Sequence, residues 1–215
     1  MIPSNKTIIL GITGASGIIY AIRLIKGLLK SKTKVYCIFS EMGKQVLAHE
    51  SKNTYLFPHP FRRQTIEDYL ILIDIIGNAN ANDFITLDAL DFFAEPASGS
   101  FQHDGMVIIP CSMKSLAAIS SGISDNLLLR SADVCMKENR QLLIVPREMP
   151  LSRIHLKNML SLAEQGVIIL PACPGFYTMP KTIIDLADMI AARIMDHLNI
   201  SHDLSLRWNE MKETS

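Results

Sequence analysis

Short apolar runs alternate along this chain with longer stretches in which apolar residues recur every three or four positions. Such runs are typical of buried strands, and the longer period is typical of amphipathic helices. The pattern predicts strands at residues 7–12, 35–39, 83–87, 106–110, 142–145 and 167–170. It predicts helices at residues 18–29, 42–49, 114–120, 127–138, 151–164 and 182–198, the last with Pro180 placed to start it. This alternation predicts an α/β fold with a mostly parallel sheet and helices on both faces.

The chain is long enough to form a buried core without disulfide or metal staples. Its 215 residues predict one domain at 1–200 and a tail at 201–215, and a chain of this size buries roughly 70% of its unfolded surface. The stretch 52–82 is less regular, and we expect an excursion on the sheet edge or an oligomer contact there. The only tryptophan, Trp208, lies in the tail.

The charge balance argues against a nucleic-acid partner. The 21 basic and 21 acidic residues cancel, whereas a nucleic-acid binder usually has a basic excess. A net charge of zero also favours self-association. No apolar stretch approaches the roughly 20 residues of a membrane span, and the N-terminus lacks the residue order of a signal peptide. We therefore expect no membrane association and a cytoplasmic location.

Several common chemistries leave no pattern in this chain. The six histidines show no metal-binding spacing, and we expect no metal. There is no Gly-x-Ser-x-Gly elbow and no Gly-x-x-x-x-Gly-Lys phosphate loop. The four cysteines form no Cys-x-x-Cys pair, so we expect small buried side chains in a reducing compartment; they are Cys37, Cys111, Cys135 and Cys173.

The first predicted strand ends in a glycine-rich stretch, GITGASG, that is typical of a nucleotide loop. Its glycines follow the order Gly-x-x-Gly-x-x-Gly, however, and not the Gly-x-Gly-x-x-Gly of dinucleotide-binding proteins. Tyr177 and Lys181 match the Tyr-x-x-x-Lys spacing of short-chain dehydrogenases, but that pair needs one continuous helix turn and Pro180 lies between them. Alone, the loop indicates an anion rather than a dinucleotide.

Polar residues follow five of the predicted strands, where open parallel sheets bind ligands. Two of these turns lead directly into a helix, and backbone amides at a helix start together with serine hydroxyls form an anion site. Two such sites suit a ligand with a phosphate and a second polar group, or two phosphorylated ligands. The five turns are residues 13–17, 40–41, 111–115, 147–148 and 172–177.

Each of these residues also has an ordinary structural explanation. Glycine and serine after a strand are common turn residues. Arg147 and Glu148 fit a surface pair, Lys137 and Arg193 fit solvated helix faces, and Tyr177 fits a side chain packed beneath its loop. Five such turns on one edge nevertheless favour a ligand site.

Long stretches of the chain resemble the flavin prenyltransferases, the UbiX group once described as aromatic-acid decarboxylases. The resemblance extends from Lys6 to beyond Ile194 and is weakest between Lys52 and Leu90. It implies a Rossmann-like or flavodoxin-like three-layer sandwich that assembles as a homododecamer, with sites built between subunits. The stretches are GITGASGIIYAIRL, EPASGS, PCSMKSLAAISSGISDNLLLRSADVCMKENR, LLIVPREMPLSRIHLKNMLSLAEQG and ILPACPGFYTMPKTIIDLADMIAARI.

The resemblance implies an activity and its partners. The family joins a dimethylallyl group from dimethylallyl phosphate to N5 of reduced flavin mononucleotide (FMN) and closes a ring at C6. The prenylated flavin serves a partner decarboxylase of the UbiD type, with a link to ubiquinone biosynthesis. No metal takes part.

The resemblance also implies residue roles. The proton-transfer glutamate falls on Glu148, a second acid on Glu50 and an interface arginine on Arg130, with Ser16 and Lys137 completing the catalytic set. The prenyl-phosphate site falls on Lys137, Arg147, Tyr177 and Arg193. The flavin site falls on Gly14, Ala15, Ser16, Ser40, Ser112, Met113, Lys114, Ser115 and Arg147.

One position departs from the family pattern, and two other functions stay open. Some members have a tryptophan near the flavin where this chain has Phe92-Phe93, and a phenylalanine can still cover an apolar ring face.

An FMN-dependent cysteinyl decarboxylase of the phosphopantothenoylcysteine type shares the fold, but it typically has Pro-Ala-Ser-Ala-Asn-Thr and a catalytic histidine where this chain has PASGS. The remaining alternative is a non-catalytic flavin carrier.

Overall fold

A six-stranded, all-parallel sheet forms the centre of the fold in our computed structural model, which describes residues 6–52 and 83–205. The strands lie in the order β3-β2-β1-β4-β5-β6. They are β1 (Thr7–Ile12), β2 (Lys34–Phe39), β3 (Phe84–Leu87), β4 (Gly105–Cys111), β5 (Leu142–Pro146) and β6 (Ile168–Ile169).

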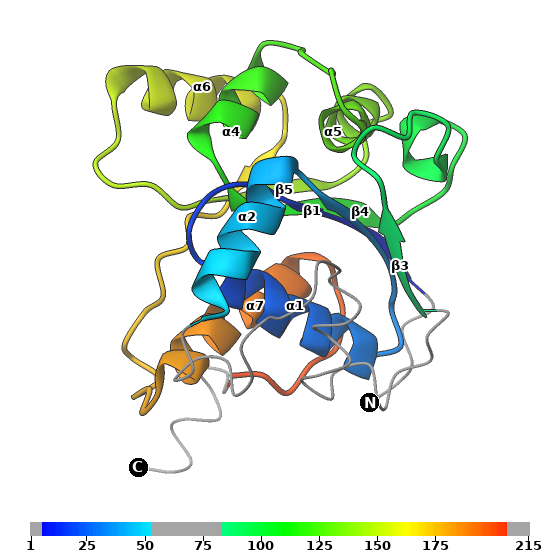
Figure 1. The fold of residues 1–215 in the computed structure, drawn as a ribbon. Coiled ribbons are helices and arrows are strands. Elements are labelled where there is room, and N and C mark those ends of the chain that lie inside the picture. Colours follow the sequence, from blue (N-terminus) through cyan, green and yellow to red (C-terminus); the bar gives the residue numbers. More distant parts are fainter. Residues whose placement is uncertain (1–5, 53–82, 206–215) are drawn as a thin grey trace.

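Helices cover both faces of the sheet. Figure 1 shows α1 and α7 on one face and α4, α5 and α6 on the other, while α2 stands across the sheet edge. The helices are α1 (Ile18–Lys30), α2 (Glu41–Glu50), α4 (Met113–Ser120), α5 (Leu127–Lys137), α6 (Arg153–Glu164) and α7 (Ile183–His197), with a short 3₁₀ turn η2 (Glu95–Ala97). The expected three-layer α/β sandwich is therefore confirmed.

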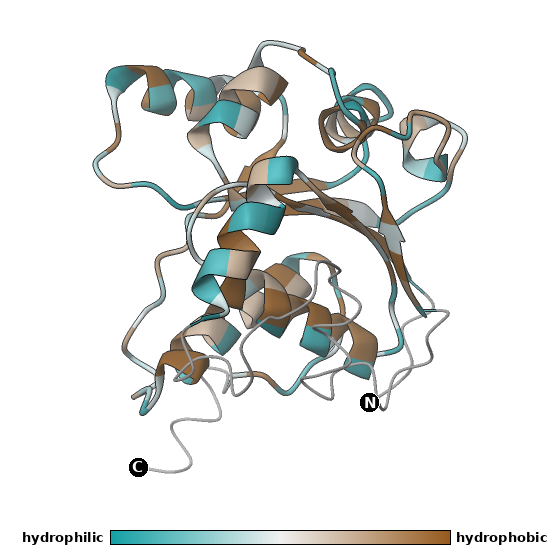
Figure 2. Ribbon diagram, in the orientation of Figure 1, coloured by the Kyte–Doolittle hydropathy of each residue, from teal (hydrophilic) through white to brown (hydrophobic). Residues whose placement is uncertain are grey.

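Two apolar cores form because alternate residues of each strand face opposite layers. Ile8 and Leu10 of β1 pack toward α1 and α7, whereas Ile9 packs toward α4 and α5. The strands are apolar along most of their length, as Figure 2 shows, because both faces are covered. The strands are thereby rigidly placed, and their carboxyl ends form a fixed edge.

The order in which successive strands are added to the sheet reverses between β1 and β4. The chain runs outward from β1 through β2 to β3 and then crosses back to β4, β5 and β6. In such sheets the loops at the reversal point separate and leave a crevice at the carboxyl ends of the strands. The loop after β1 and the loop after β4 border that crevice here.

Every predicted strand and helix in the described residues is present, and the errors are at the ends. Helix α6 begins at Arg153 because the Ser152 side chain caps it by accepting from the His155 amide at 3.2 Å. Pro180 does not start α7; the capping residue is Thr182. The 3₁₀ turn η2 was not predicted. The irregular stretch up to residue 82, apart from Lys52, and Trp208 lie outside the described residues.

Three of the four cysteines are buried, as expected, but Cys173 is exposed. Burial raises the pKa of both Cys111 and Cys135 to about 12 and raises the pKa of Cys37 well above its usual value. Because the thiolate is the reactive form, iodoacetamide at pH 8 should label the folded protein once, at Cys173. Mass spectrometry should find one adduct on the native chain, four after unfolding, and none on native Cys173→Ser. Rapid labelling of any buried thiol would contradict the packing described above.

Candidate functional site

The loop after β1 is fixed to the loop after β4 through one buried hydroxyl. Thr13 is 1% exposed, and its Oγ1 donates to the Pro110 carbonyl at 2.8 Å. The same oxygen accepts from the Ser112 amide at 2.7 Å. The two loops that border the crevice therefore keep a constant separation.

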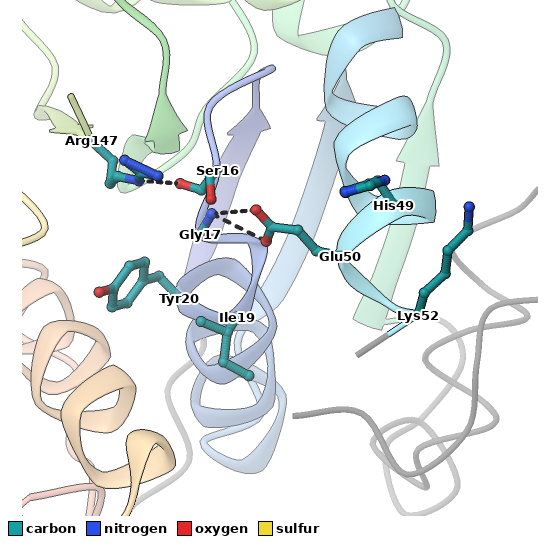
Figure 3. A pocket seen from close by; sticks show the side chains of 8 residues that line it. All are labelled: Ser16, Gly17, Ile19, Tyr20, His49, Glu50, Lys52 and Arg147. Carbon is teal, nitrogen blue, oxygen red and sulfur yellow. Dashed lines mark hydrogen bonds between the residues drawn. The ribbon is translucent and has the colours of Figure 1, made fainter. Parts of the chain in front are cut away.

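The start of α1 is occupied by a carboxylate of the same chain. The capping residue, Gly17, has φ 109° and offers no side chain. Glu50, the last residue of α2, accepts from the Gly17 amide at 2.9 and 3.1 Å and from the Ile18 amide at 2.9 Å. Figure 3 shows this contact. Glu50 thus accepts hydrogen bonds from the amides at which the sequence predicts a bound anion.

Arg147 reaches the same loop from the end of β5. Its Nε donates to the Ser16 carbonyl at 3.0 Å. Together with Ser16, Gly17 and Glu50 it borders a cleft of about 610 Å³, which we call the arginine cleft. The other lining residues are Ile19, Tyr20, His49 and Lys52. Two cationic side chains, Arg147 and Lys52, thus line a cleft in which Glu50 is the acidic residue.

A second hollow of about 710 Å³ lies on the other side of the loop. Ser40 and Ser112 cap α2 and α4, where their Oγ atoms accept from the Gly43 amide at 3.0 Å and the Ser115 amide at 3.3 Å. We call it the serine hollow; its lining includes Gly14, Ser40, Ser112, Lys114 and Ser115, with the apolar residues Met42, Ala89, Leu90, Ile123 and Leu129. Hydroxyls at helix starts beside an apolar wall suit a phosphate joined to a flat ring.

Gly14 has to be a glycine because α2 packs directly on it. A Cβ at this position would lie 2.5 Å from the Cβ of Met42. The loop 13–17 contributes to both hollows: Gly14 lines the serine hollow, and Ser16 and Gly17 line the arginine cleft. Ala15 and Met113 are buried, and neither is among the residues that line the two hollows.

Several residues assigned from the resemblance do not reach the arginine cleft within one chain. Lys137 pairs with Glu138 in an exposed ion pair, and Arg193 pairs with Asp196 at 3.4 Å. Tyr177 is exposed on the loop before α7. None of Lys137, Tyr177 and Arg193 is among the residues that line the cleft.

Glu148 and Arg130 also lie elsewhere. Glu148 is exposed, and its Oε1 accepts from the Met149 amide at 3.0 Å. Arg130 donates to Asp133 at 2.8 Å and to the Ala97 carbonyl at 3.3 Å. Of the assigned catalytic set, one chain brings together only Ser16 and Glu50.

Sequence reasoning missed four residues of the arginine cleft: Ile19, Tyr20, His49 and Lys52. Tyr20 had a usable signal, since it lies three residues after Gly17 and thus one helical turn away on the same face. Burial raises the pKa of Tyr20, the Arg147 charge acts in the opposite direction, and the nearby Cys173 adds to the increase. The phenol therefore stays neutral near pH 7.

Residues 6–52 and 83–205 were searched for a metal-binding cluster and for a membrane-spanning helix. The residues that the structure describes contain no cluster of three or more histidine, cysteine, aspartate or glutamate side chains suited to a metal ion. In the same part of the chain, no helix is long and apolar enough to cross a bilayer.

The parallel α/β sheet with its reversal point is the architecture on which mononucleotide- and flavin-binding proteins are built, and comparison with known proteins identifies a flavin-binding class. The family model described as Flavoprotein matches residues 3–201. A flavin prenyltransferase UbiX from Halalkalibacterium halodurans is 47% identical over 94% of this chain and 93% of its own length. Its counterpart from Pseudomonas aeruginosa is 41% identical over 95% of each chain. The chain belongs to the flavin prenyltransferase family.

Solved structures support the same conclusion. AnUbiX (PadA1), in complex with FMN and dimethylallyl pyrophosphate, has a TM-score of 0.81 and 33% identity, covering 96% of this chain and 98% of its own. A dodecameric FMN-dependent UbiX-like decarboxylase from Escherichia coli O157:H7 has a TM-score of 0.79 and 36% identity, covering 94% and 98%. The peptidyl-cysteine decarboxylase EpiD, at 17% identity and a TM-score of 0.55, shares the fold alone.

Proposed function

We propose that this chain is a flavin prenyltransferase that joins the dimethylallyl group of dimethylallyl phosphate to N5 and C6 of reduced FMN. One observation supports this best: residues of loop 13–17 line two hollows at the reversal point of the sheet, Gly14 one of them and Ser16 and Gly17 the other. One hollow has the serines for a flavin phosphate, and the other has a cation for a second phosphate. Two phosphorylated substrates can thus bind side by side, with their reacting atoms in contact next to Ser16.

The serine hollow fits the flavin. Ser40, Ser112, Ser115 and Lys114 offer hydroxyl and ammonium donors, and the apolar side chains beside them suit a ring system. Gly14 lets the backbone come close to a ligand, because no side chain projects from the loop at that point. Reduced flavin supplies the nucleophilic nitrogen and carbon when it is bound.

The arginine cleft fits the prenyl phosphate. Arg147 can grip a phosphate with its two terminal nitrogens while Nε stays bonded to Ser16. Its positive charge stabilises the negative charge that grows on the phosphate as the carbon–oxygen bond breaks. The side chains of Ile19 and Tyr20 keep water from the allylic carbon. Ser16 faces the place where the two substrates would meet.

We further propose that other copies of the chain complete the site. Lys137, Tyr177 and Arg193 are exposed in a single chain and would contribute to a neighbour's prenyl-phosphate site, while Arg130 would contact a neighbour. Apolar side chains are exposed on α6 and on the loops before α6 and α7, as expected for a surface covered by a second copy; they include Met149, Ile154, Leu156, Leu160, Phe176 and Met179. A dodecamer, the state of the Escherichia coli relative, is the assembly we expect.

Ring closure at C6 releases a proton, and Glu148 is its proposed acceptor. The departing phosphate is the alternative acceptor. We expect Glu148→Gln to reduce the rate of prenylated-flavin formation by about 10²-fold, the order of a lost general base, while flavin affinity stays unchanged. The measurement is single-turnover formation of product under anaerobic conditions beside a flavin-binding titration. Full activity of the variant would assign the proton transfer to the phosphate instead.

The fate of the product is a separate proposal. The prenylated flavin would pass to a UbiD-type decarboxylase in the cytoplasm, with ubiquinone biosynthesis as one pathway. The relatives' names support the prenyl transfer; the recipient rests on the family resemblance alone.

The decisive experiment is anaerobic incubation of the protein with reduced FMN and dimethylallyl phosphate. Mass spectrometry should find a flavin heavier by one five-carbon prenyl unit, in more than stoichiometric amount over several turnovers. Product limited to one equivalent per chain would favour the flavin carrier, and unchanged flavin would refute the proposal. Parallel incubation with dimethylallyl pyrophosphate tests the donor bound by AnUbiX.

A further inference from the structure

Tyr20 lines the arginine cleft from the first turn of α1, and its contacts point to a role beyond the exclusion of water. Its amide donates to the Gly17 carbonyl at 3.1 Å. A Cβ built on Gly17 would lie 2.9 Å from Tyr20 Cδ2 and 3.0 Å from Cε2. The ring therefore lies directly against the backbone of Gly17, and no side chain larger than hydrogen fits between them.

Arg147 converges on the same point from the carboxyl end of β5. The Cβ position of Gly17 lies 3.9 Å from Arg147 Cγ, so the alkyl stem of the arginine and the Tyr20 ring both border Gly17. Figure 3 shows the two side chains on the same side of the loop. The Arg147 Nε is bonded to the Ser16 carbonyl. Among the described residues, its two terminal nitrogens donate no hydrogen bond and remain for an anion.

Tyr20 also connects this corner to the loop before α7. The ring is half-buried against the core formed between the sheet and the helices α1 and α7. Both Arg147 and Cys173 lie close enough to its hydroxyl to influence its pKa. Cys173 belongs to the stretch 172–177 that includes Tyr177. The ring is thus anchored by packing on one side and adjoins the cationic side chain on the other.

We propose that Tyr20 is a positioning residue: its ring, seated on Gly17, supports the stem of Arg147 and keeps the guanidinium directed at the phosphate in the arginine cleft. The inference rests on the proposed function. A long arginine side chain loses rotamer freedom when it grips an anion, and a preformed support reduces that loss. The support comes from the ring and not from the hydroxyl.

The test compares Tyr20→Ala with Tyr20→Phe in the anaerobic prenylation assay. Tyr20→Ala should raise KM for dimethylallyl phosphate about tenfold and leave flavin affinity within about twofold, because the serine hollow lies on the other side of the loop. Tyr20→Phe keeps the ring and should match the wild type within about twofold. In an Arg147→Ala background, Tyr20→Ala should add almost nothing, since its effect acts through that arginine.

Controls separate positioning from damage to the fold. Lys26→Ala, on the exposed face of the same helix, should behave as wild type. Tyr20→Leu retains apolar bulk without a flat ring and should reproduce the rise in KM if Tyr20→Ala fails to fold. The inference is overturned if Tyr20→Phe is as impaired as Tyr20→Ala, or if neither Tyr20→Ala nor Tyr20→Leu changes KM.

A failure of the proposed function would be visible separately. If the wild-type protein forms no prenylated flavin, the function is wrong. Tyr20 is then tested by calorimetric titration with inorganic phosphate. Tyr20→Ala should weaken that binding about tenfold and Tyr20→Phe should leave it unchanged, and equal binding by all three proteins would refute the inference.

Discussion

Arg147→Ala should lower the rate of prenyl transfer by about 10²–10³-fold, the order expected when a preorganised cation is removed from a developing charge. The variant loses the guanidinium that faces the arginine cleft and the bond from Nε to the Ser16 carbonyl. Single-turnover kinetics with saturating flavin measure the effect. The flavin itself should still bind, because the serine hollow keeps Ser40 and Ser112.

Two variants make this prediction specific. Arg147→Lys keeps a positive charge but not the planar donor group, so it should recover only part of the rate. Lys26→Ala removes an exposed cation on α1 that lines neither hollow, and it should leave the rate unchanged. A rate for Arg147→Ala within about threefold of the wild type would mean that other groups hold the phosphate.

Asp188→Ala should produce the largest loss of stability. Asp188 accepts from Arg23 Nε at 2.5 Å and from Nη2 at 2.7 Å, and the two side chains are only 12% and 18% exposed. Removing one partner leaves the Arg23 charge unpaired between α1 and α7, which costs about 3 kcal/mol for a buried pair. For a protein of this size, that corresponds to a drop in Tm of roughly 6–12 °C, measurable by calorimetry.

Two further variants serve as comparisons for the loss of stability expected of Asp188→Ala. Lys44→Ala breaks an ion pair with Glu41 whose side chains are 49% and 74% exposed, and it should change stability by less than about 1 kcal/mol. The double variant Arg23→Met with Asp188→Leu replaces the buried pair by apolar packing and should recover most of the loss. If Asp188→Ala were no worse than Lys44→Ala, the pair between α1 and α7 would be solvated in solution.

The fold could be predicted because its signals are local. Each strand is a short apolar run, and each helix repeats apolar residues on one face. The burial of Ile8 and Leu24 could therefore be predicted from the local sequence pattern alone. The starts of helices were predicted less accurately. Capping by Ser152 and Thr182 sets the first residues of α6 and α7, whereas Pro180 does not set the start of α7. The turn η2 has no periodic pattern and was missed for that reason.

The site was predictable only where it follows the ends of strands. Ser40, Ser112 and Arg147 each come directly after a strand, and the parallel sheet brings them to one edge. The contact of Glu50 with the start of α1 joins residues 32 and 33 positions apart. No rule of local spacing reveals it, and the same holds for the meeting of Tyr20 with Arg147. Lys137, Tyr177 and Arg193 were assigned by resemblance, and their place in an assembly stays a prediction.

Loop 13–17, which lines both hollows, has no regular secondary structure, and four contacts hold it in place. Thr13 is bonded to the loop after β4, Gly14 rests on α2, Ser16 is held by Arg147 and Gly17 by Glu50. A ligand that tightens any one of these anchors reduces the motion left to the whole loop. Because Gly14 lines one hollow and Ser16 the other, a ligand that shifts the loop in one hollow also shifts a wall of the other. The loop thus links the two hollows mechanically and is part of the wall of each.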